Sequence, residues 1–305
     1  MTEAQCDALV IGGGPSGLTA AIYLARFHLR TTVVDAGNSR AGTIPRTRNH
    51  AGYPGGIVGA DLVAAMRTQT IENGAVILPG TVDLLDRNGA GFVAEGAFGR
   101  VKARAVILAT GVVNRRPAVD DAFHAAALAA GRLRYCPLCD GFEVTDARIG
   151  VLGTGEHGVR EAIFLRSFTA DLTLIAPDGV HDLTPAQLDN LTTAGVRVID
   201  GPAHDFGLAA DAITVVTRAG TLAFASIYPA LGSHIHSGLA ASLGAATVEA
   251  GCITVDGHQR TTVPGLYAAG DVVMGLDQIS HAMGEGGVAA TTLRNDLAEG
   301  NHIYR

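Results

Sequence analysis

The fold of this chain is decided by one stretch, Ala8-Leu9-Val10-Ile11-Gly12-Gly13-Gly14-Pro15-Ser16-Gly17. Its four leading apolar residues predict a short buried strand that runs directly into a G-x-G-x-x-G turn. A helical pattern follows from about Leu18 to Phe27, and a second strand, Thr31 to Val34, ends at Asp35. This order is the fingerprint of a dinucleotide-binding βαβ unit, in which Asp35 would accept hydrogen bonds from ribose hydroxyls.

The glycines of this turn, Gly12, Gly14 and Gly17, permit a tight turn and the close approach of the backbone to a pyrophosphate. Pro15 and Ser16 complete the turn at the start of the helix. A helix N-terminus carries free N–H groups and the positive end of the dipole, so it favours phosphate. We therefore predict that these five residues bind a dinucleotide.

A second unit of the same kind begins with a predicted strand, Arg148 to Leu152. It continues as Gly153-Thr154-Gly155-Glu156-His157-Gly158, a helix through Phe168 and a strand from Leu172 to Ile175. Gly153, Gly155 and Glu156 are candidate nucleotide contacts. The position that matches Asp35 is Ala176, and no arginine pair follows that could hold a 2′-phosphate. A working nucleotide site and a retained fold with weakened binding both stay open.

The segments between and after these units complete an α/β pattern. Residues 75–104 predict a small antiparallel meander, and a buried strand from Ala105 ends at Ala109-Thr110-Gly111, small enough for a flat cofactor to approach. From Gly238 the chain returns to the first domain. A strand that ends at Gly270-Asp271 suits a cofactor pyrophosphate, and the last helix begins near Gln278.

The stretch Tyr135-Cys136-Pro137-Leu138-Cys139-Asp140-Gly141 lies before the second unit. Its two thiols are spaced to close a small disulfide, and one thiolate can attack while the other resolves. Asp140 is a candidate proton donor or acceptor for the pair. By itself, C-x-x-C fits a zinc half-site, a structural pair or a redox couple.

Composition narrows the class of protein. The chain has 305 residues, of which 48% are hydrophobic, 17% are charged and 40 are glycine, which is typical of a soluble two-domain α/β enzyme. A net charge of −7 without a Lys/Arg run argues against a nucleic-acid partner. Neither a signal peptide nor a membrane-spanning stretch is predicted, so we expect a cytoplasmic protein with no membrane association.

With these pieces in order, the chain resembles the low-molecular-weight thioredoxin reductase family of flavoprotein disulfide reductases over essentially its whole length. The matching residues are Gly12-x-Gly14-x-x-Gly17, Asn49 with Gly52-Tyr53-Pro54, Ala109-Thr110-Gly111, Cys136-x-x-Cys139-Asp140-Gly141, Gly153-x-Gly155 and Gly265-Leu266-Tyr267-Ala268-Ala269-Gly270-Asp271.

The resemblance implies two Rossmann-like, three-layer ββα domains. An FAD-binding domain, residues 1–113 and 242–305, would be split around a NAD(P)-like domain, residues 114–241, that carries the cysteines. The resemblance also implies a homodimer, tightly bound FAD, and a thioredoxin-like protein or a small disulfide or dithiol as substrate.

The resemblance also implies roles for single residues. Cys136 would be the thiol exposed for exchange, Cys139 the one beside the flavin, and Asp140 the acid–base residue. A flavin-coupled pair explains the cysteines better than zinc, because no second ligand pair has the right spacing, and no metal site is predicted. The FAD contacts carried over beyond the first glycine turn are Asp35, Asn49, Val82 near the adenine, Ala109, Thr110, Gly111, Gly270, Asp271, Gln278 and Ile279.

The electron donor is left open by departures from the family pattern. Where reductases that use NADPH carry a basic cluster, this chain reads Ile175-Ala176-Pro177-Asp178, so NADPH, NADH and a reduced iron–sulfur protein all stay open. Three functions compete. A disulfide reductase is predicted first, because dithiol oxidases that resemble this family tend to have His in the place of Asp140. A dithiol oxidase that uses oxygen and a flavin redox sensor without turnover are the alternatives.

Overall fold

The computed structural model describes residues 3–299. Its contacts divide the chain into two compact units. The first comprises the chain up to Arg46, His50–Val113 and the chain from Ile235 onward, and the second comprises Thr47–Asn49 and Asn114–His234. The second unit is therefore built almost entirely from one continuous insertion into the first.

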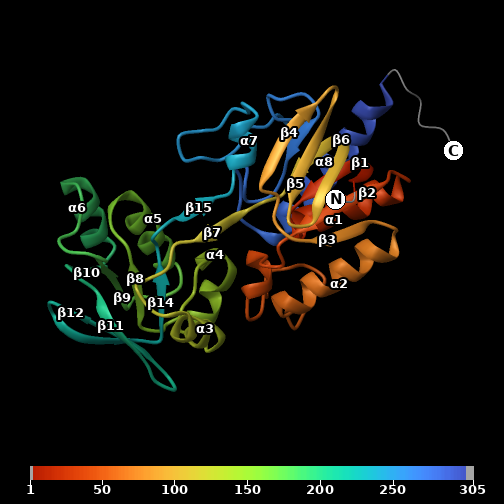
Figure 1. Cartoon of the computed structure of the whole chain (residues 1–305). Coiled ribbons are helices and arrows are strands. Elements are labelled where there is room, and N and C mark those ends of the chain that lie inside the picture. Colours follow the sequence, from red (N-terminus) through yellow and green to blue (C-terminus); the bar gives the residue numbers. More distant parts are fainter. Residues whose placement is uncertain (1–2, 300–305) are drawn as a thin grey trace. The chain divides into compact units, whose positions relative to one another are not determined.

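The first unit is built on a seven-stranded sheet among the residues that the structure describes (Figure 1). Its strand order is β3-β2-β1-β6-β5-β4, and β16 also pairs with β6. The first half of β6 pairs antiparallel with β5 and its second half pairs parallel with β16, while β1 runs parallel to both β2 and β6. The strands are β1 (Glu3–Ile11), β2 (Thr31–Asp35), β3 (Val76–Pro79), β4 (Leu84–Asn88), β5 (Gly91–Gly96), β6 (Gly99–Leu108) and β16 (Leu266–Ala268).

Alternation along β1 divides the core of this unit into two. Ala8 and Val10 face α1 and α8, which cover one side of the sheet, whereas Leu9 and Ile11 pack in the cluster that contains Phe92 of β5. The period of two in a strand is what sends neighbouring side chains to opposite faces. The helices of this unit are α1 (Pro15–Arg26), η1 (Arg40–Thr43), α2 (Gly59–Glu72), α7 (Gly238–Ser242) and α8 (Ile279–Ala298).

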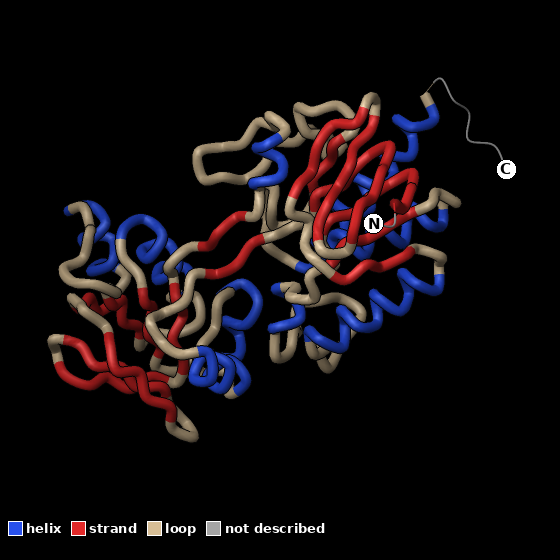
Figure 2. Tube along the Cα trace, in the orientation of Figure 1, coloured by secondary structure: helices blue, strands red, loops and turns tan. Residues whose placement is uncertain are grey.

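The second unit has a four-stranded parallel sheet of order β10-β9-β8-β14 and a three-stranded antiparallel sheet of order β11-β12-β13 (Figure 2). Helices α5 and α6 pack on one face of the parallel sheet, and α3 with the antiparallel sheet packs on the other. Its strands are β8 (Ile149–Leu152), β9 (Leu172–Ile175), β10 (Arg197–Ile199), β11 (His204–Leu208), β12 (Ile213–Thr217), β13 (Gly220–Phe224) and β14 (Ser226–Pro229). Its helices are α3 (Asp121–Ala129), α4 (Pro137–Asp140), η2 (Gly141–Val144), α5 (Gly155–Leu165) and α6 (Pro185–Thr193).

Two short strands, β7 (Val112–Asn114) and β15 (Ser233–Ile235), pair with each other where the chain passes between the units. Among residues 3–299, none of the helices combines the length and the apolar character that a membrane crossing requires.

The predicted α/β class with Rossmann-like parallel sheets is confirmed. Three local predictions were wrong. Val76–Pro79 pairs parallel with β2 instead of joining an antiparallel meander, and the strand expected to begin at Ala105 begins at Gly99 because β6 is shared by antiparallel and parallel partners. The helix expected to reach Phe168 ends at Leu165, after which turns lead into β9.

Candidate active site

The two cysteines of the C-x-x-C motif form a disulfide with their Cα atoms 5.2 Å apart. Cys136 is the N-cap of α4, and Pro137 occupies the first helical turn, where its missing N–H costs nothing. The Cys139 amide donates to the Cys136 carbonyl at 2.9 Å, which fixes the short turn between the sulfurs. Both cysteines are half-buried, and Leu138 between them is 46% exposed. The motif can therefore open and close with little movement of the backbone.

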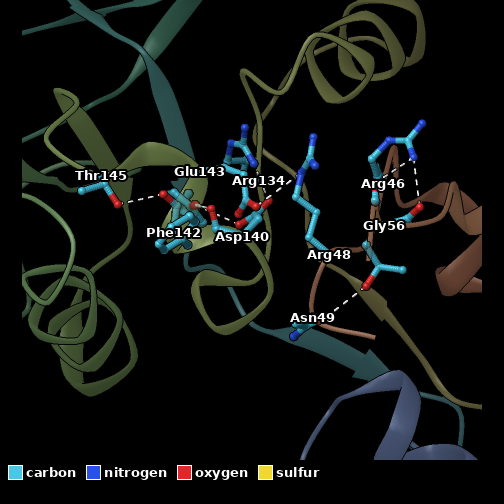
Figure 3. A network of polar contacts seen from close by, with 12 residues as sticks. Arg46, Arg48, Asn49, Gly56, Arg134, Asp140, Phe142, Glu143 and Thr145 are labelled. Carbon is cyan, nitrogen blue, oxygen red and sulfur yellow. Dashed lines mark hydrogen bonds and ion pairs between the residues drawn. The ribbon is translucent and has the colours of Figure 1, made fainter. Parts of the chain in front are cut away.

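Asp140 follows the cysteines and has a partner on each carboxylate oxygen (Figure 3). Arg134 Nη1 donates to Oδ2 at 2.8 Å, and the Tyr228 hydroxyl donates to Oδ1 at 2.9 Å. Burial raises the pKa of Asp140, the Arg134 charge and the two hydrogen bonds oppose that rise, and Glu143 adds to it. The carboxylate is thus held in a partly desolvated pocket, where its proton affinity depends on these neighbours.

A second carboxyl group, Glu161 of α5, lies close enough to interact with Asp140. Burial, and then the charge of Asp140, raise the pKa of Glu161 to about 7. Tyr135, directly before Cys136, has its hydroxyl 2.8 Å from His124 Nε2, and burial raises its pKa to about 12. Titratable groups therefore surround the cysteine segment within the second unit.

The glycine turn of the first unit leaves no room for side chains at two of its positions. A Cβ atom on Gly12 would lie 2.2 Å from the Ala109 carbonyl oxygen, and one on Gly17 would lie 2.0 Å from the Gly12 oxygen. Gly14, the N-cap of α1, differs because a Cβ there would meet only Ser39 Oγ, at 3.4 Å. Packing explains Gly12 and Gly17, whereas Gly14 keeps open space at the start of the helix.

Polar groups around this turn suit a dinucleotide. Ser16 Oγ is buried at the start of α1 and has no hydrogen-bond partner among residues 3–299, so it is available to a ligand oxygen. Asp35 Oδ1 accepts from the amides of Gly13 and Gly37 at 3.1 Å each, and Oδ2 pairs with Arg67. The open space at Gly14 and the unsatisfied hydroxyl of Ser16 together fit FAD at this edge of the sheet.

The C-terminal part of the first unit closes the same region. A Cβ on Gly270 would lie 2.8 Å from Ser16 Cβ, which places the Gly270-Asp271 turn beside α1. The Gly270 amide donates to Glu285 Oε2 at 2.6 Å, and Asp271 Oδ2 pairs with Arg40 Nη1 at 3.0 Å.

The other predicted FAD contacts are spread over both units. Gln278 is the N-cap of α8 and Ile279 its first residue. Thr110 Oγ1 donates to the His236 carbonyl at 2.7 Å, beside Ala109 and Gly111. Val82 is buried in the core of the first unit. Asn49 groups with the second unit, where its Nδ2 donates to the Leu138 carbonyl at 3.4 Å.

The second glycine turn offers a poorer fit to a phosphorylated nucleotide. Thr154 Oγ1 accepts from the Asp182 amide at 2.8 Å and lies 3.1 Å from His181 Nδ1, so the loop after β9 is tied to the turn. Glu156 accepts from Gln187 at 3.0 Å. Residues 176–183 contain two aspartates and neither Lys nor Arg. Gly153 and Gly155 keep the turn itself, but these residues do not fit the 2′-phosphate of NADPH.

Metal ligation has no support within the described part of the chain, where no three His, Cys, Asp or Glu residues gather as a ligand set.

Comparison with known proteins agrees with this geometry. Residues 6–286 match the family profile described as pyridine nucleotide-disulphide oxidoreductase. The chain belongs to this family. Within the pyridine nucleotide-disulphide oxidoreductases it is 30% identical to a thioredoxin reductase of Peptoclostridium acidaminophilum, over 93% of this chain and 95% of the relative. It is also 30% identical to a thioredoxin reductase of Listeria innocua, over 96% and 94%.

A solved structure extends the comparison to the fold of these oxidoreductases. The crystal structure of thioredoxin reductase from Streptococcus pyogenes superposes with a TM-score of 0.89 at 26% identity, and the match covers 98% of this chain and all of that one. The predicted resemblance to thioredoxin reductases is therefore confirmed, and the protein is a thioredoxin reductase-like disulfide oxidoreductase. Membership in the family implies FAD as cofactor.

Sequence reasoning missed the groups that surround Asp140. Arg134 lies two residues before Cys136 and could have been noticed as a charge beside the motif. Tyr228 and Glu161 are far away in the sequence, on β14 and α5, and carry no motif of their own. Only the parallel sheet of the second unit brings them to the cysteine segment.

Proposed function

We propose that this protein is a FAD-dependent thiol–disulfide oxidoreductase in which the Cys136–Cys139 pair exchanges with a disulfide or dithiol outside the chain. The observation that carries the proposal is the bonded pair followed directly by Asp140, whose proton affinity is set by buried charges. A structural staple would need no titratable neighbour of this kind.

The two units would have different roles. The first unit would hold FAD on the glycine turn, with Ser16 and Asp35 toward its phosphate and ribose groups and Asp271 beyond them. The second unit would carry the cysteines as the NAD(P)-like domain of the family. FAD, when bound, supplies a two-electron acceptor or donor for the cysteine pair.

Exchange with a substrate follows ordinary thiol–disulfide chemistry. A substrate thiol gives its proton to Asp140 as its sulfur bonds to Cys136 Sγ, the Cys136–Cys139 bond breaks, and Cys139 keeps the electron pair as a thiolate. The second substrate thiol then attacks the substrate sulfur of this mixed disulfide, which completes the substrate disulfide and releases the sulfur of Cys136 with the electron pair of the broken bond. The reverse sequence reduces a substrate disulfide. A thioredoxin-like protein or a small dithiol would be the substrate and a homodimer the assembly, as the resemblance to thioredoxin reductases implies.

A dithiol oxidase is the second candidate, and one observation favours it. Asp178 and Asp182 stand in the loop after β9, where a reductase driven by NADPH needs positive charge, and the loop is hydrogen-bonded to Thr154. An enzyme of this kind would take electrons from a dithiol and pass them to oxygen.

The test is to mix FAD-loaded protein anaerobically with NADPH, NADH or dithiothreitol and to follow the flavin absorbance. Bleaching by dithiothreitol is expected from the proposed exchange. Rapid bleaching by either nucleotide would identify a nucleotide-driven reductase. Bleaching by the dithiol alone, followed by oxygen consumption when air is admitted, would identify the oxidase. Protein that none of the three reductants bleaches would contradict the proposed function.

A further inference from the structure

Asp140 accepts a hydrogen bond on each carboxylate oxygen, one from Arg134 in its own segment and one from Tyr228 of β14, far away in the sequence. We propose that Arg134 and Tyr228 are positioning residues that hold Asp140 as a carboxylate turned toward β14, and that they thereby set the pH range in which the cysteine pair exchanges. The inference rests on the proposed function, because it assigns Asp140 the proton of the exchanging thiol.

The guanidinium of Arg134 is itself held by hydrogen bonds. Its Nε donates to the Gly131 carbonyl at 3.1 Å and to Ser226 Oγ at 3.2 Å, and Ser226 Oγ donates in turn to the Gly131 carbonyl at 2.7 Å. A Cβ on Gly131 would lie 2.9 Å from Arg134 Nη2, so the bare backbone there makes room for the side chain. These contacts of Nε orient the planar guanidinium, and its Nη1 donates to Asp140 Oδ2.

Tyr228 fixes the other oxygen of the carboxylate. Its side chain is fully buried in the core of the second unit, and a buried phenol needs a partner for its hydroxyl. Asp140 is that partner at 2.9 Å. Burial and the nearby carboxylate raise the pKa of Tyr228, so the hydroxyl stays protonated and serves as a donor. A protonated Asp140 could not accept on both oxygens equally well, so the pair of donors favours its ionised form.

Burial and one negative group act against these two donors. Glu143 follows Asp140 in the next turn and is paired with Arg48 at 3.4 Å (Figure 3). Glu161 lies on α5, which packs beside α4, and the charge of Asp140 contributes to raising its pKa to about 7, so Glu161 ionises after Asp140. The proton affinity of Asp140 is therefore a balance in which burial and Glu143 raise it and Arg134 and Tyr228 lower it. Substitutions on the two sides of this balance must shift the pH dependence in opposite directions.

The experiment measures reduction of the Cys136–Cys139 disulfide in FAD-loaded protein by dithiothreitol between pH 4 and pH 9. Acid quenching, alkylation and mass spectrometry count the opened disulfide, and the rate is divided by the fraction of reagent present as thiolate. A break in the corrected profile marks the ionisation of Asp140, and Asp140→Asn removes it.

Each variant has an expected direction of shift for the break in the pH profile. Arg134→Gln moves the break upward by about one pH unit, the lower end of the effect of an adjacent opposite charge, and Tyr228→Phe moves it upward by less. Glu143→Gln moves it downward, because the charge of Glu143 raises the pKa of Asp140. Arg134→Lys keeps the charge and restores part of the shift. The matched control is Arg132→Gln, because the Arg132 guanidinium donates to the carbonyls of Ala225 and Ala210 and should leave the break in place.

An unchanged break in both Arg134→Gln and Tyr228→Phe, with each variant folded by circular dichroism, would overturn the proposal. So would an upward shift in Glu143→Gln. Failure of the proposed function is distinguishable, because in that case the flavin is not bleached by dithiothreitol even though the disulfide opens and its pH profile still responds to the variants.

Discussion

Substitutions at two glycines of the first turn, Gly17 and Gly14, should separate the effect of packing from the effect of cofactor binding. In Gly17→Ala the new Cβ would lie 2.0 Å from the Gly12 oxygen and 3.1 Å from Ala109 Cβ, whereas ordinary contact begins near 3.4 Å. Helix α1 would have to move away by about 1.4 Å, and overpacking of this kind costs about 1–3 kcal/mol of unfolding free energy. Gly17→Ala should therefore be destabilised even without cofactor.

Gly14→Ala is the matched variant. Its Cβ would meet only Ser39 Oγ at 3.4 Å, and its φ of −81° suits any residue. We expect a cost below about 1 kcal/mol, from the weaker N-cap alone. The same Cβ would stand where the backbone must approach a pyrophosphate, so affinity for FAD should fall at least tenfold.

The assay uses protein stripped of FAD. Urea unfolding followed by circular dichroism gives the stability of each apo form, and quenching of flavin fluorescence gives the dissociation constant for FAD. The reasoning is refuted if apo Gly17→Ala unfolds at the wild-type urea concentration, or if Gly14→Ala binds FAD as tightly as the wild type does.

Three further predictions concern single side chains. Thr184→Ala removes the capping box that Thr184 forms with Gln187 at the start of α6, and should lower the unfolding free energy by about 1 kcal/mol in urea titrations. Tyr267→Phe leaves Asp296 without its 2.6 Å hydrogen bond and should cost about 1–2 kcal/mol in the same assay. The folded pKa of Glu161, about 7, lies above its ordinary value of 4.5, so ionisation opposes folding and stability should fall as the pH rises through that range. Glu161→Gln should flatten this fall when urea midpoints at pH 5 and pH 8 are compared, and an equally steep fall in the variant would contradict the assignment.

Local sequence signals were sufficient wherever one segment dictates its own structure. The glycine turn led to the helix α1, although α1 begins at Pro15 and not near Leu18. Hydrophobic runs located β2, β8 and β9 to within a residue. In each case the signal and the structure lie within a few neighbouring residues.

Pairing partners could not be read in the same way. Strand β6 has an alternating first half and an apolar second half because it pairs with β5 along one part and with β16 along the other, and β16 lies far away in the sequence. Ile71 of α2 is apolar but 58% exposed, since among the residues of that helix the core beneath it buries Leu62 and Met66.

In the candidate site, too, the residues of one motif were predicted from the sequence, and those from distant segments were not. Cys136, Cys139 and Asp140 were found because they form one motif. The groups that surround Asp140 were not found, because β14 contributes Tyr228 and α5 contributes Glu161 only after the sheet of the second unit has formed.

The central claim is that electrons pass between FAD and the Cys136–Cys139 pair. The most direct measurement is anaerobic addition of dithiothreitol to FAD-loaded wild type and Cys139→Ser, with the flavin absorbance followed in a stopped-flow instrument. We predict that the wild-type flavin is bleached and that the variant, with FAD still bound, stays oxidised on the same timescale. Bleaching of Cys139→Ser at the wild-type rate would show that electrons reach FAD without the cysteine pair and would contradict the account.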